Sequence, residues 1–152
     1  RVAAIYVAGG INCSLNAIFY TSCPRAIIQT GASGAIFALI GAHLSNLILN
    51  WGEMRLRVFY LFAYVMLTCL LDAQLWVLLW NIASGGGTAA VSALAYPKDG
   101  ISHMGHLLGF VEGLLLGLAL LRNLVVYRFE KVLQIAAAAA AAILPIILFC
   151  FW

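Results

Sequence analysis

A serine flanked by small residues is the first candidate for chemistry in this sequence. Ser33 lies in the run Gly31-Ala32-Ser33-Gly34, at the start of an apolar stretch. If a helix begins there, its first turn exposes unpaired backbone N–H groups, which can stabilise the oxyanion that forms when a serine attacks a carbonyl group. The same run also fits a small-residue motif that lets two helices pack closely. The residue types alone leave both interpretations open.

A histidine followed by a periodic row of glycines is the second candidate. His106 precedes Gly109, Gly113 and Gly117, which recur every four residues. Residues four apart share one face of a helix, so we predict a glycine stripe against which a neighbouring helix packs closely. His106 would lie one turn from the stripe, about 5 Å along the axis. If that neighbour begins near Ser33, a hydroxyl and an imidazole meet, which is the minimum for an activated nucleophile.

The elements that would position these residues are membrane helices, because the composition excludes a soluble domain. Of the 152 residues, 65% are hydrophobic and 9% are charged, whereas a soluble domain carries about 25% charged residues. The mean hydropathy is +1.06. One helical span takes about 20 apolar residues, so we predict five transmembrane helices, at 2–21, 31–50, 58–82, 101–121 and 132–152. The predicted fold is an all-α polytopic membrane protein, with one domain over residues 1–152.

The distribution of basic residues predicts the orientation in the membrane. If successive connections alternate sides, one side holds Arg1, Arg55, Arg57, Arg122, Arg128 and Lys131, and the other holds Arg25 and Lys98. Short cytoplasmic loops are enriched in Lys and Arg, so we expect the first side to be cytoplasmic. Ser33 and His106 would then lie near the extracytoplasmic end. The net charge of +3 is dispersed, and without a clustered basic face it excludes nucleic-acid binding.

The other polar residues of the apolar spans have simpler explanations. Hydrogen bonds between helices are predicted for Asn12, Asn16, His43, Asn46 and Gln74. A buried carboxyl such as Asp72 stays protonated or finds a partner, and the sequence identifies no partner for Glu112. The cysteines Cys13, Cys23, Cys69 and Cys150 lie far apart and are predicted to be apolar fillers. No cluster of ligands predicts a metal or an organic cofactor.

Three segments together resemble a known family. Residues 31–51, GASGAIFALIGAHLSNLILNW, resemble the fourth transmembrane helix of the rhomboid intramembrane serine proteases, with its GxSG motif. Residues 101–117, ISHMGHLLGFVEGLLLG, are similar to the sixth helix, in which the catalytic histidine precedes Gly-x-x-x-Gly. Residues 121–133, LRNLVVYRFEKVL, resemble the following connection in the secretase-type eukaryotic branch. The resemblance implies a rhomboid-like helical bundle in which helices three to seven are present. We therefore expect an N-terminally truncated domain that lacks the first two helices.

The resemblance also implies the roles of individual residues in a catalytic dyad. Ser33 would be the nucleophile, and His106 would be the general base and then the general acid. Gly31 and Gly34 would support the motif, in which the backbone N–H of Ser33 contributes to the oxyanion hole. Phe37, at a position where family members often have tyrosine, would pack its ring on the histidine.

The implied function is that of a serine endopeptidase that cleaves transmembrane segments of single-pass membrane proteins. It would be a multi-pass protein of the secretory pathway or the plasma membrane, with its active site toward the extracytoplasmic side. His103 does not fit the spacing before the glycines and is predicted to be a loop or mouth residue. Two alternatives are an inactive rhomboid-like protein that binds and routes membrane clients, and a small transporter or channel fragment. Only Asp72 and Glu112 hint at the transporter class, and the sequence predicts no oligomeric state.

Overall fold

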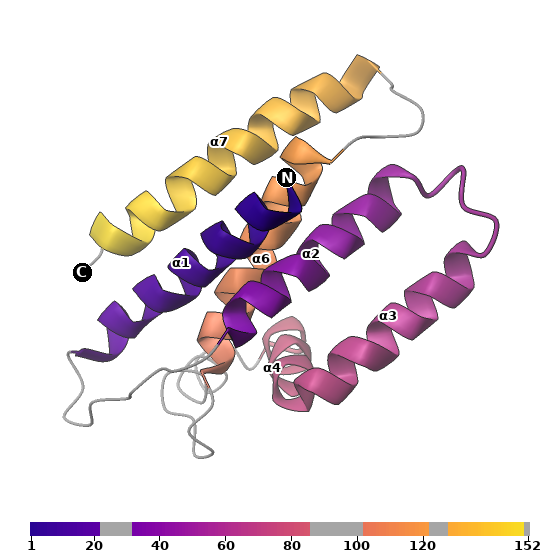
Figure 1. Cartoon of the computed structure of the whole chain (residues 1–152). Helices are drawn as coiled ribbons and strands as arrows, with labels where there is room; N and C mark the ends of the chain where they lie inside the picture. The colour runs from indigo at the N-terminus through magenta and orange to yellow at the C-terminus, as the bar shows by residue number, and fades with distance from the viewer. Residues whose placement is uncertain (22–31, 86–101, 122–127, 151–152) are drawn as a thin grey trace.

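The chain folds as a bundle of helices. The computed structural model describes residues 1–21, 32–85, 102–121 and 128–150, and these residues contain no strand. The helices are α1 (Val2–Thr21), α2 (Ser33–Leu49), α3 (Arg57–Leu71), α4 (Ala73–Ala83), α6 (His103–Leu120) and α7 (Arg128–Cys150). In Figure 1, α2 and α6 run side by side, α1 and α7 lie toward one side of this pair, and α3 and α4 lie beyond α2. The predicted all-α fold is confirmed.

The third predicted span is broken at Asp72. The spans expected at 2–21, 31–50, 101–121 and 132–152 correspond to α1, α2, α6 and α7, but the span expected at 58–82 forms two helices. The backbone of Asp72 leaves the helical region, with φ −152° and ψ 84°. Its N–H still donates to the carbonyl oxygen of Thr68 at 3.0 Å, and the indole N–H of Trp76 on α4 donates to the Thr68 hydroxyl at 3.2 Å. The prediction of one continuous helix was therefore wrong.

Two of the described helices are long and apolar enough to cross a bilayer. The 18-residue windows His103–Leu120 and Glu130–Ile147 meet this condition, and Val2–Leu15, Ser33–Leu49 and Arg57–Leu71 are shorter apolar helices. At a rise of 1.5 Å per residue, 18 residues span about 27 Å, close to the thickness of a bilayer's hydrocarbon core. α3 leaves most of its apolar surface uncovered, because its only buried residues are Tyr64 and Thr68.

Contact between the backbones of α2 and α6 forms the centre of the bundle. A side chain at Gly109 of α6 would overlap the carbonyl group of Gly34 on α2, and one at Gly113 would overlap the backbone of Ala38. The hydroxyl of Ser45 on α2 donates to the carbonyl oxygen of Leu114 at 2.6 Å. The predicted glycine stripe is confirmed, and the helix that packs against it is α2. Close packing of this kind is typical of membrane helices, which associate through small residues.

Hydrogen bonds from nearby and from distant residues hold the ends of α1 and α6. Ser102 caps α6, since its hydroxyl accepts from the N–H of Gly105 at 3.1 Å, as serine commonly does before a helix. Arg1 donates from its guanidinium to the carbonyl oxygen of Leu120 at 2.7 Å, which joins the start of α1 to the end of α6. The starts of α1, α3 and α7 and the ends of α2 and α6 lie at one end of the bundle (Figure 1).

We predict that filling the glycine stripe separates α2 from α6. In Gly113→Leu the new side chain would overlap the backbone of Ala38, so the free energy of unfolding should fall by about 3 kcal/mol or more. Thermal unfolding in detergent, followed by circular dichroism, measures the change. Gly52→Ala is the matched control, because nothing lies within 4 Å of an added Cβ at Gly52. Equal losses in both variants would contradict the packing argument.

Candidate active site

Ser33 is the first residue of α2 and is exposed. No side chain caps the start of α2 at Ala32, so its first N–H groups have no side-chain acceptor at that position. Such groups carry the positive end of the helix dipole and form the kind of donor set that can bind an oxyanion. Gly34 is buried in the helix packing, and Gly31 lies outside the described residues.

His106 is buried one turn into α6, at the level of the Ser33–Gly34 bond. A side chain at Gly34 would meet the carbonyl oxygen of Gly105 at 3.5 Å, and one at Gly109 would meet the carbonyl oxygen of Gly34. The two helices therefore bring Ser33 and His106 to the same end of one interface. Among the described residues, no hydrogen bond joins the two side chains. Catalytic hydrogen bonds are often long before substrate binds and tighten in the complex.

Phe37 stacks on the imidazole of His106. The ring centroids are 4.3 Å apart and the planes differ by 12°. Phe37 is 4% exposed and packs in a cluster with Ile40, Met104, Leu107 and Phe110. The position four residues after Ser33 faces α6 because residues i and i+4 share a helix face. The stack fixes the plane of the imidazole ring.

A carboxylate contacts the same histidine, and the sequence did not predict this contact. Asp72, at the break between α3 and α4, is 5% exposed. Its Oδ2 lies 2.7 Å from Nδ1 of His106, and both of its carboxylate oxygens lie 3.0 Å from Nδ1 of His103. Asp72 is 31 positions from His103 and 34 positions from His106 in the sequence, so no local spacing could reveal the cluster. The one available signal was a carboxyl group in an apolar segment, which is costly unless it has partners.

The sequence predicted that His103 is a loop or mouth residue, and the loop position is wrong because His103 lies in a helix. It is the first residue of α6, is 8% exposed, and is held there because α6 begins at its Ser102 cap. The fold also corrects the expectation that no ligand cluster exists. Asp72, His103 and His106 offer ligand atoms that all lie within 4.8 Å of one another, so these three residues could hold a metal ion.

Glu112 has a partner on α1. Its carboxyl group hydrogen-bonds with the side-chain amide of Asn12, but Oε2 of Glu112 and Oδ1 of Asn12 are buried without a partner among the described residues. The two residues expose 3% and 2% of their surfaces. Asn12 thus joins two helices as predicted. Glu112 lies nearly two turns beyond His106 along α6 and takes no part in the cluster of imidazoles and carboxylate.

In the part of the chain that the structure describes, Asn46 and His43 do not form the hydrogen bonds between helices that the sequence predicted. The Oδ1 of Asn46 accepts from the side chain of Asn50 at 2.8 Å, within one helical turn, because four-residue spacing places the two amides together. His43 is exposed and makes no hydrogen bond among the described residues. Its ring lies 6.3 Å from that of Tyr64 on α3. The side chains of Asn16 and Gln74 lie outside the described part.

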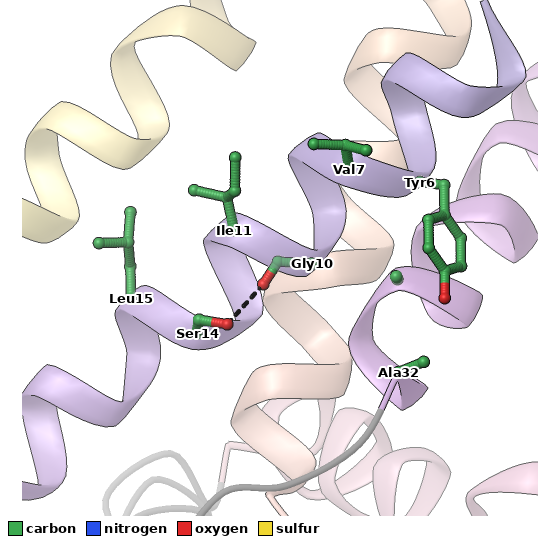
Figure 2. A pocket seen from close by; sticks show the side chains of 8 residues that line it. Tyr6, Val7, Gly10, Ile11, Ser14, Leu15 and Ala32 are labelled. Carbon is green, nitrogen blue, oxygen red and sulfur yellow. Dashed lines mark hydrogen bonds between the residues drawn. The ribbon is translucent and has the colours of Figure 1, made fainter.

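A shallow groove runs beside the start of α2. It has a volume of about 480 Å³, and Figure 2 shows its lining residues along α1 and at Ala32, beside the start of α2. Its lining residues are Tyr6, Val7, Gly10, Ile11, Ser14, Leu15, Ala32 and Ala35. Ser14 donates to the carbonyl oxygen of Gly10 at 2.8 Å, so its hydroxyl is occupied within α1. Ser33 falls between the two alanines that line the groove.

Comparison with known proteins decides the family. The family model of the rhomboid domain matches residues 1–123. The chain belongs to the rhomboid family. Rhomboids are membrane proteins, which agrees with the apolar helices of this chain. No solved structure matches the chain.

Individual rhomboids match most of this chain. Rhomboid-related protein 1 of Caenorhabditis elegans is 33% identical over 137 residues, which cover 88% of this chain and 33% of that protein. Rhomboid-related protein 3 of Homo sapiens is 31% identical over 81% of this chain and 28% of its own length. Rhomboid-like protease 5 of Toxoplasma gondii is 24% identical over 91% of this chain and 14% of its own. The chain spans about a third or less of these relatives.

We predict that Phe37 stabilises the bundle as well as the imidazole. Phe37→Ala removes a buried ring and should lower the free energy of unfolding by about 3 kcal/mol. Thermal unfolding in detergent measures the loss. Phe59→Ala is the control, because Phe59 is 64% exposed on α3, and its removal should cost no more than about 0.5 kcal/mol. A Phe37→Ala midpoint equal to that of Phe59→Ala would contradict the prediction.

Proposed function

We propose that this chain carries the catalytic centre of an intramembrane serine protease, with Ser33 as nucleophile and His106 as general base and acid. One observation carries the proposal. The start of α2 and the first turn of α6 meet through glycines, which places a serine and a ring-stacked imidazole at one level of one interface. A protease in the same family, from Toxoplasma gondii, matches along 91% of the chain.

The proposed reaction uses these groups in order. Oγ of Ser33 attacks the carbonyl carbon of the scissile peptide bond while Nε2 of His106 takes the hydroxyl proton. The carbonyl electron pair moves onto oxygen, and the N–H groups at the start of α2 stabilise the resulting anion. The tetrahedral intermediate then expels the amine, which receives the proton from His106. Water, activated by the same imidazole, hydrolyses the acyl-enzyme and frees Ser33.

The proposed setting is a multi-pass chain with the site toward the extracytoplasmic face. The starts of α1, α3 and α7 lie opposite the Ser33 end of the bundle (Figure 1), and these starts bring Arg1, Arg57 and Arg128 to that opposite end. Basic residues favour the cytoplasmic side. The substrates would be single-pass membrane proteins, cut near the extracytoplasmic end of their transmembrane helix.

An inactive rhomboid-like protein that binds membrane clients is the second candidate. The presence of both Ser33 and His106 in the sequence favours the protease, because a binding role requires neither residue. The transporter class loses support from the two residues that suggested it. Asp72 and Glu112 are engaged with histidines and with Asn12, respectively.

We predict that an activated-serine probe labels Ser33. A fluorophosphonate reacts by forming an Oγ–P bond and releasing fluoride, so the protein in liposomes should be labelled. Ser33→Ala and His106→Ala should lower labelling and cleavage of a transmembrane substrate by at least about 1,000-fold. Ser14→Ala is the matched control, since the Ser14 hydroxyl bonds to its own helix. Absence of labelling in folded wild-type protein would favour the binding role.

We also predict that cleavage depends on how easily the substrate helix unwinds. A peptide bond inside a helix is covered by its neighbours, and one Gly or Pro lowers helix stability by about 1 or 3 kcal/mol, respectively. A substrate with a Gly-Pro pair replaced by Ala-Ala should therefore be cut at least about tenfold more slowly, as measured by product formation in liposomes. A replacement of equal composition at the opposite end of the helix is the control. Equal rates for the two substrates would refute the dependence.

A further inference from the structure

The proposed reaction of Ser33 and His106 gives no role to one buried ionisable group of the site, the carboxyl group of Asp72. Asp72 interrupts what would otherwise be a continuous apolar helix and is 5% exposed. Burying a carboxylate is costly unless hydrogen-bond donors surround it. The two imidazoles of His103 and His106 on α6 supply such donors. The break in the helix is what lets the carboxylate face them.

We propose that Asp72 is a positioning residue that holds His106 in the tautomer required of a general base. The inference rests on the proposed proteolytic function and deepens it. Oδ2 of Asp72 lies 2.7 Å from Nδ1 of His106, and an ionised carboxylate can only accept a hydrogen bond. Nδ1 therefore carries the proton. The lone pair is then on Nε2, the atom that must accept the proton of Ser33.

The carboxylate and Phe37 constrain the ring in complementary ways. Stacking on Phe37 at 4.3 Å and 12° fixes the plane of the imidazole. A stacked ring can still turn over by half a rotation about its Cβ–Cγ bond, which would exchange the nitrogens with carbon atoms. The hydrogen bond from Nδ1 to Asp72 opposes that rotation. Together the two contacts leave one orientation of the ring, so that Nε2 is presented in a single place.

His103 holds the carboxylate in turn. Its Nδ1 lies 3.0 Å from both oxygens of Asp72, and its ring meets that of His106 edge-on, with the interplanar angle at 85°. When Ser33 gives up its proton, His106 becomes a cation beside this anion, and the short hydrogen bond stabilises that state. The carboxylate keeps its charge throughout and receives no proton. This arrangement extends the serine–imidazole pair to a Ser–His–Asp system that three separate helical segments supply.

Replacing Asp72 with asparagine tests the positioning role. In Asp72→Asn the amide can donate to Nδ1, which favours the tautomer with the proton on Nε2. We expect kcat for a transmembrane substrate to fall by about 100-fold to 10,000-fold, with KM changed by less than about threefold. The rate of fluorophosphonate labelling should fall in parallel. Asp72→Glu keeps an anionic acceptor and should recover at least about tenfold of the lost kcat.

The matched control is a second buried carboxyl on α6. Glu112→Gln makes the same chemical change beside Asn12, away from the imidazoles, and should leave kcat within about threefold of wild type. Thermal unfolding of each variant separates a loss of fold from a loss of positioning. If Asp72→Asn does not fold, Asp72→Ala with added formate replaces it. Formate can accept from Nδ1 in the space left by the carboxyl group, and activity should rise with its concentration.

The outcomes separate this inference from the function on which it rests. Wild-type protein that no probe labels, or labelling that survives Ser33→Ala, would refute the protease and with it the role of Asp72. Labelling at Ser33 with Asp72→Asn as active as wild type would refute the positioning role alone. The same three residues could also bind a metal. Loss of activity with a chelator, restored by zinc, would overturn the hydrogen-bonding role, and we expect the chelator to have no effect.

Discussion

The close approach of α2 and α6 is the constraint on which the structure depends. Gly109 and Gly113 of α6 lie against the backbone of α2 with no room for a side chain. In lipid, helices gain little from burying apolar surface, so small residues and close backbone contact must supply the association. The contact also fixes which residues face each other at its end. Moving α6 by one turn, about 5.4 Å, would take His106 away from Ser33.

The sequence predicted the part of the site that local periodicity encodes. The four-residue glycine spacing and the GASG run specify a helix pair, and the resemblance of residues 31–51 and 101–117 to rhomboid helices assigned the pair its chemistry. The carboxylate at Asp72 could not be found in this way. Its contacts to His103 and His106 join residues 31 and 34 positions apart, and they depend on the place at which the chain leaves α3.

The predicted hydrogen bonds between helices formed for some of the described polar residues and not for others. Asn12 faces α6 and reaches Glu112, but Asn46 has a nearer partner one turn along its own helix, in Asn50. The partner of a polar side chain in an apolar span can thus lie on its own helix, and the sequence does not say which helix holds it. His103 illustrates the same limit, since its side chain contacts Asp72, which lies 31 residues away in the sequence.

The exposure of α3 has a consequence for how this chain can vary. α3 buries Tyr64 and Thr68 and presents its remaining apolar side chains outward, while Asp72 at its end is tied to α6. The outward-facing side chains of Phe59 and Leu70 are 64% and 84% exposed. Such side chains must be compatible with hydrocarbon, but they need not match the shape of a neighbour within the bundle. Substitutions along α3 are therefore limited by the need for side chains that are compatible with hydrocarbon. Along α6 they are limited by side-chain volume, because even one added carbon atom at Gly109 or Gly113 would overlap the backbone of α2.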